Sequence, residues 1–141
     1  MKIINNLMLA AVAATLLFQS SITRAGDHGP RQHITFQKWW TGDKFEGTVD
    51  GDCGTGTVIF TFGAVPWGAA IVHFTGEYTI TTAECTFKAV CGGFQDARTG
   101  HVVVNGVVTD GQYLGNRVQV RAQVTDGVAY GTMTITPGEL E

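Results

Sequence analysis

His73 and Glu77 are the side chains whose types and spacing best suit chemistry. An imidazole and a carboxylate can act together as general base and general acid. Within the stretch 69–82 they fall on the same side of a two-residue repeat, with their Cα atoms about 13 Å apart, so they could line one cavity without touching. If this side faces inward, the pair is a candidate catalytic site; if it faces outward, both are ordinary solvated side chains.

Aromatic residues form the second group of candidates, with Tyr78 inside the expected strand 69–82 and Trp67 and Tyr113 at a loop and a strand end. Trp67, Tyr78 and Tyr113 could stack on an apolar ligand and, with His73 and Glu77, line its binding site. The alternative for aromatic residues in such places is that they cap the two ends of the core.

Other kinds of catalytic site have little support in the sequence. Beyond residue 25 there is no serine, so a serine hydrolase triad is excluded if a leader ends there. No HExxH or CxxC spacing is present, and the glycines at 54–56 and 92–93 are too few for a phosphate-binding loop. We therefore expect neither a metal nor a cofactor.

The three cysteines allow one disulfide and one remaining thiol. Cys85 and Cys91 would lie about 20 Å apart on one continuous strand, which is too far for a bond between them. The preferred pairing is therefore Cys53 with either Cys85 or Cys91. Three buried free thiols are the alternative.

The first 25 residues read as a secretory signal peptide. A positive start at Lys2 precedes a short apolar run, and small residues stand at the positions before a cut after Ala25. Residues 26–43 are then expected to be a leader or plug segment, and 44–141 a single domain. We expect a periplasmic or secreted location, with no membrane span once the signal is removed.

The charge of the exported chain limits its partners. Removal of Lys2 and Arg24 takes the formal net charge from −3 to −5. Nucleic acids and anionic membranes both need a basic surface, so neither is an expected partner. An apolar small molecule is the expected ligand, and the sequence carries no signal for the number of subunits.

The pattern of residues that must position these groups is that of strands. β-Branched and aromatic residues alternate with polar ones, and Gly or Asp-Gly pairs mark the turns. Residues 34–40 fit a first strand, a short helical turn or a plug. We expect an all-β fold, a single antiparallel up-and-down β-barrel of about 7–8 strands, with a β-sandwich as the alternative. The expected strands are 45–49, 54–62, 69–82, 85–91, 101–109, 113–124 and 128–136.

Several of these segments resemble the allene oxide cyclase-like barrels, which are related in shape to dirigent proteins and lipocalins. The resemblance is carried by GEYTI at 76–80, TF at 86–87, GG at 92–93 and GHVVVNGVVTDG at 100–111. It implies a small eight-stranded barrel that binds apolar molecules, some members steering a cyclisation by holding a reactive conformer.

Two functions follow as hypotheses. The first is an exported barrel that binds an apolar small molecule, with a cofactor-independent cyclase or isomerase activity as an extension. The second is a non-catalytic secreted or periplasmic protein that binds a partner or has a structural role. A cavity of a few hundred cubic ångströms with His73 or Glu77 in its wall would favour the first. A barrel filled by Val, Ile and Phe would favour the second.

Overall fold

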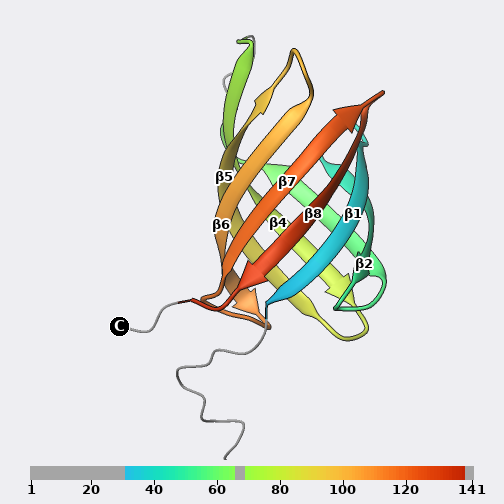
Figure 1. The fold of residues 1–141 in the computed structure, drawn as a ribbon, viewed down its shortest axis with the longest axis vertical. Helices are drawn as coiled ribbons and strands as arrows, with labels where there is room; N and C mark the ends of the chain where they lie inside the picture. The colour runs from blue at the N-terminus through green and yellow to red at the C-terminus, as the bar shows by residue number, and fades with distance from the viewer. Residues whose placement is uncertain (1–30, 66–68, 139–141) are drawn as a thin grey trace, which may run out of the picture. The chain divides into compact units, whose positions relative to one another are not determined.

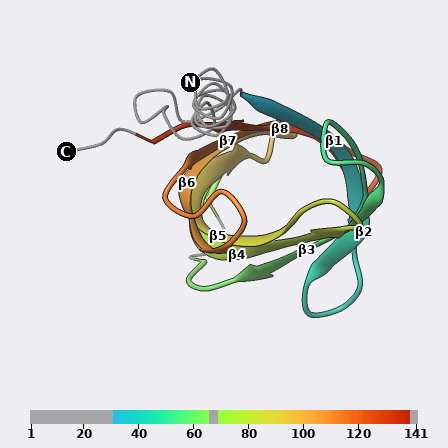
Figure 2. The same ribbon diagram turned by 90° about the horizontal axis from the view of Figure 1, so that it is seen from below.

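A computed structural model describes residues 31–65 and 69–138, and these form one closed β-barrel. Each strand pairs with the next in antiparallel fashion, and the last pairs with the first, so the expected up-and-down barrel is confirmed (Figures 1 and 2). Closure leaves no unpaired strand edge along the sheet. The strands are β1 (Gln32–Trp40), β2 (Phe45–Gly51), β3 (Gly56–Phe62), β4 (Ile71–Thr82), β5 (Thr86–Asp96), β6 (His101–Gly111), β7 (Arg117–Thr125) and β8 (Val128–Thr136).

The first strand lies in a segment that we expected to precede the barrel. Of the three alternatives for residues 34–40, the structure has the strand, and β1 pairs with both β2 and β8. The boundary expected at residue 44 is therefore too late. The physical reason is that Ile34, Phe36 and Lys38 alternate with exposed residues, which gives this segment an inward face of its own. The expected signal peptide lies outside the described residues.

Two other strand limits differ from expectation by more than two residues. β5 continues through the glycines at 92–93 to Asp96, because both neighbouring strands pair with it there. Tyr113, expected at the start of a strand, instead lies in the turn before β7 with a φ of 63°.

None of the described residues belongs to a helix long and apolar enough to cross a membrane.

The inward faces carry the core, as period-two alternation predicts. On β7, Val118 and Val120 are buried, whereas Arg117 and Arg121 are not. On β4, Tyr78 and Ile80 are buried and His73 is exposed. Inward glycines let the strands coil closely: a Cβ added at Gly76 would meet the carbonyl oxygen of Thr61 at 2.5 Å and the ring of Phe60.

The two ends of the barrel differ. At the lower end in Figure 1, where β1 begins and β8 ends, a disulfide joins the β2–β3 and β4–β5 connections through Cys53 and Cys85. The hydroxyl of Thr82 donates a hydrogen bond to the Cys53 carbonyl oxygen at 2.7 Å and accepts one from the Cys85 amide at 2.8 Å. The Tyr113 ring packs edge-on against Phe87 at 5.7 Å, so this end is closed by packed side chains.

The opposite end is lined by aromatic side chains that are only partly buried. Trp40, 46% exposed, packs against Phe45 and Phe62 with ring centroids 5.3 and 6.1 Å apart. Phe74 packs edge-on against Phe62 at 5.5 Å. This rim is the more open end of the barrel, and the interior beneath it holds the candidate site.

Candidate functional site

A lysine inside the barrel is the most unusual feature of the structure. Lys38 lies on the inward face of β1 and is only 6% exposed. Its partners in the two neighbouring strands are Gly47 on β2 and Ala129 on β8, whose small size leaves room for the long side chain. Lysine is rarely buried in proteins unless its charge is paired.

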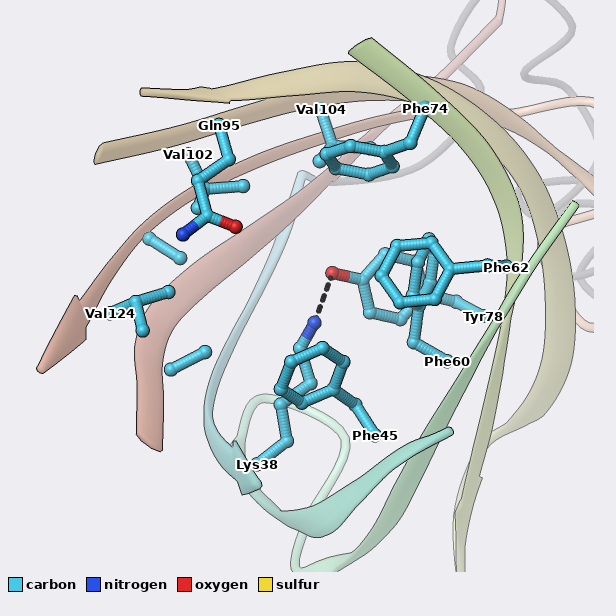
Figure 3. A pocket seen from close by; sticks show the side chains of 12 residues that line it. Lys38, Phe45, Phe60, Phe62, Phe74, Tyr78, Gln95, Val102, Val104 and Val124 are labelled. Atoms are coloured by element: carbon cyan, nitrogen blue, oxygen red, sulfur yellow. Dashed lines mark hydrogen bonds between the residues drawn. The ribbon is translucent and has the colours of Figure 1, made fainter. Parts of the chain in front are cut away.

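The amine of Lys38 has one hydrogen-bond partner and a surround of aromatic rings. Nζ donates to the hydroxyl of Tyr78 at 3.0 Å (Figure 3). It lies 4.8–5.2 Å from the centroids of four rings, which belong to Phe36, Phe45, Phe60 and Tyr78. Among the described residues, no carboxylate lies within ion-pair distance of it. The amine is thus held by ring faces and a phenol in place of a counter-charge.

Burial determines the protonation of this pair. It lowers the pKa of Lys38 from its ordinary value of 10.5 to about 7, because the ammonium loses its hydration, and the electrostatic influence of Cys91 opposes part of the shift. Burial also raises the pKa of Tyr78 well above 10.0, with Cys91 adding to the effect. At neutral pH the phenol is therefore protonated, and the neutral form of the lysine is far more populated than it is in an exposed lysine.

A small cavity lies beside the amine and reaches the rim. Its volume is about 30 Å³, enough for roughly two water molecules or for a polar group of two or three atoms. Figure 3 shows Lys38 and Tyr78 pointing toward each other on one side of it, with Gln95 and Val124 on the other. Its wall consists of Lys38, Phe45, Phe60, Phe62, Phe74, Tyr78, Gln95, Val102, Val104, Ala122, Val124 and Ala129.

The third cysteine lies near this region as a buried thiol. Cys91 has no disulfide partner, and its Sγ is 3.7 Å from the carbonyl oxygen of Ala89. Burial raises its pKa to about 12, although the positive charge of Lys38 opposes the shift. It therefore stays a neutral thiol at physiological pH.

The structure does not bring the sequence-predicted site residues together. His73 is exposed on the outer face of β4, 6.0 Å from the Phe94 ring, and Glu77 is half-buried on the same outer face. Neither lines the interior cavity. The outward alternative for this face is the one observed, so the two residues are surface side chains, and a catalytic role for the pair inside the barrel has no support.

The aromatic candidates have three different outcomes. Tyr78 is in the wall of the cavity. Tyr113 is at the closed end, where its hydroxyl lies 3.6 and 3.3 Å from the sulfur atoms of Cys53 and Cys85. Trp67 lies outside the described residues. The expected pairing of Cys53 is confirmed, with Cys85 as the partner.

Lys38 was not predicted to be a site residue. A signal for it was present, since Ile34, Phe36 and Lys38 fall on one side of a two-residue repeat. A lysine that continues an apolar face is a candidate for burial. This pattern has a meaning only in a strand, and residues 34–40 also fitted a short helical turn or a plug.

Comparison with known proteins adds no assignment to this geometry. No family model, curated protein or solved structure matches the chain.

Proposed function

We propose that this protein binds a small organic molecule that has an apolar body and one oxygen-bearing end group. The end group lies in the cavity beside Lys38 and Tyr78, and the apolar body extends through the aromatic rim. The observation that carries the proposal is a buried amine that has no carboxylate partner in the part of the chain that the structure describes and that lines a cavity opening toward the rim. Apolar pockets with a few convergent polar groups are typical of ligand sites.

The size of the cavity determines the kind of ligand. About 30 Å³ is too small for a whole drug-sized molecule, whose sites usually have roughly 300–1,000 Å³. A carboxylate, formyl or hydroxymethyl group fits that space. The remainder of the ligand would contact Phe45, Phe62, Phe74 and Val124, which are partly exposed at the rim.

The amine and the phenol define the preferred end group. An ammonium at Lys38 would donate to a carboxylate or carbonyl oxygen, and the protonated Tyr78 hydroxyl would donate to the same atom. The four surrounding rings make the environment of the amine apolar, which strengthens both bonds. A cyclase or isomerase activity would depend on these two interior groups as acid and base, with no cofactor.

The location that we propose, periplasmic or secreted, agrees with the disulfide between Cys53 and Cys85. Such bonds persist in oxidising compartments and are rare in reducing ones.

The test is a calorimetric titration of the purified protein with hexanoate and with hexan-1-ol. We expect both to bind, and Lys38→Met to weaken hexanoate by about tenfold or more, because a hydrogen bond to a charged group contributes about 1.5–3 kcal/mol. Lys88→Met, which removes an exposed lysine of β5, is the matched control and should bind as the wild type does. If neither probe binds, the interior is simply a filled core, and the non-catalytic alternative is favoured.

A further inference from the structure

The amine of Lys38 is suited to covalent chemistry as well as to hydrogen bonding. An amine acts as a nucleophile only when it is neutral, and desolvation in an apolar pocket is a known way to keep it so. Here burial brings the pKa of Lys38 to about 7. Among the described residues there is no carboxylate beside the amine to hold the proton on the nitrogen.

We propose that Lys38 condenses with the carbonyl group of an aldehyde or ketone bound in this cavity, forming an imine. This inference rests on the proposed binding function and names the class of ligand for it. The cavity has room for a carbonyl group within reach of Nζ, and the rim accepts an apolar substituent.

Tyr78 lies where the reaction needs a proton donor. The nitrogen lone pair attacks the carbonyl carbon, a C–N bond forms, and the carbonyl oxygen takes up a proton to give a carbinolamine. The hydroxyl group then leaves as water after a second protonation, while the nitrogen loses its own protons to form the C=N bond. The Tyr78 hydroxyl, 3.0 Å from Nζ, can donate to the carbonyl oxygen in the first step and to the leaving hydroxyl in the second, and after each donation its oxygen takes back one of the two protons that the nitrogen loses. The amine and the carbonyl compound yield the imine and one water molecule, so no other reactant is needed.

The other lysines of the described region differ from Lys38. Lys44 lies 3.6 Å from a carboxylate oxygen of Asp43 and 3.5 Å from one of Glu46. Lys88 is exposed on the outer face of β5. Neither lines the cavity, and both serve as internal controls for selectivity.

The experiment treats the purified protein with hexanal and sodium cyanoborohydride, which reduces an imine to a stable secondary amine. Digestion and mass spectrometry then locate the adduct, whose mass exceeds that of the lysine by that of hexanal less one oxygen atom. We expect the adduct at Lys38 to form about tenfold faster than at Lys88, or more. Added hexanoate should slow labelling at Lys38 and leave labelling at the other lysines unchanged. Tyr78→Phe should slow labelling at Lys38, and Lys38 should still be the residue labelled fastest.

The outcomes distinguish failure of the imine proposal from failure of the proposed ligand binding. Labelling at Lys38 no faster than at Lys88, with hexanoate binding intact, overturns the imine and leaves the binding proposal standing. Failure of both labelling and binding overturns both. Because the adduct is mapped in wild-type protein, the result does not require that Lys38→Met folds.

Discussion

Replacement of Lys38 by methionine should make the protein more stable near neutral pH and should change how its stability depends on pH. Methionine keeps the length of the side chain but removes the charge, so the cost of burying an ammonium disappears. The Tyr78 hydroxyl then lacks its partner, which costs about 1–3 kcal/mol. The double variant Lys38→Met/Tyr78→Phe removes that orphaned hydroxyl as well.

The sign and size of the pH effect follow from the pKa of Lys38. That pKa is about 7 in the folded protein and 10.5 ordinarily, so between these values the unfolded chain binds the extra proton. The free energy of unfolding of the wild type therefore rises with pH across that window. From about pH 7 to about pH 9 the rise attributable to Lys38 is about 2 kcal/mol, and below the folded pKa it levels off.

Other titrating groups make the comparison between variants more informative than the wild-type curve. Cys91 on β5 influences Lys38 electrostatically, Tyr78 on β4 is its hydrogen-bond partner, and the pKa of each of these two groups is raised. Above their ordinary pKa values they lower stability as pH rises, which offsets the effect of Lys38 at the alkaline end. The difference in stability between wild type and Lys38→Met largely removes these shared contributions.

The assay is urea-induced unfolding followed by circular dichroism at several pH values, with the slope of the transition checked for constancy. We expect the advantage of Lys38→Met over the wild type to shrink by about 2 kcal/mol from about pH 7 to about pH 9. The free energy of unfolding of Lys88→Met should depend on pH in the same way as that of the wild type. A constant difference between wild type and Lys38→Met over this range would show that the aromatic rings and the phenol hold the proton on Lys38, and would refute the reasoning.

Three further predictions concern the architecture around the site. Replacing Cys53 and Cys85 by alanine should lower the free energy of unfolding by up to about 4 kcal/mol in the same urea assay, because the bond closes a loop with a sequence separation of 32; no change would contradict this. Gly76→Ala should cost about 1–3 kcal/mol, because its methyl group meets backbone and a ring, whereas Gly92→Ala, whose nearest contact is 3.6 Å, should be tolerated in thermal unfolding. Thr82→Val should cost about 1–3 kcal/mol, because the buried carbonyl of the disulfide loop loses its donor; hydrogen exchange should quicken in that loop first.

Local pattern was enough to predict most of the barrel. Val118 and Val120 alternate with Arg117 and Arg121, and a period of two assigns each set to one face whatever the neighbouring strands are. The limits of β5 were harder, because the glycines at 92–93 read as a turn in isolation. They are held in the strand by pairing with Phe74 and Thr75 of β4 and with Val104 and Asn105 of β6, and the local pattern around the glycines does not include these partners.

The candidate site was less predictable than the fold. His73 and Glu77 are chemically suitable but lie on the outer face, since the opposite face of the same strand supplies the core. Lys38 was not predicted because residues 34–40 fitted a strand, a helical turn or a plug, and only the strand places Lys38 on the same face as Ile34 and Phe36. Its partner Tyr78 is 40 positions away, a separation that no local pattern spans.

The sequence by itself determined an all-β chain whose strands each have an apolar and a polar face, and it favoured a disulfide at Cys53. These follow from side-chain periodicity, turn residues and the reach of a strand, all of which act over short distances. Only the tertiary structure decided that the sheet closes through pairing of β1 with β8 and that Cys85 is the partner of Cys53. It alone decided that Lys38 meets Tyr78 among aromatic rings, because these residues come from strands that are distant in sequence. The lowered pKa of Lys38 is a consequence, since it depends on which strands remove the amine from water.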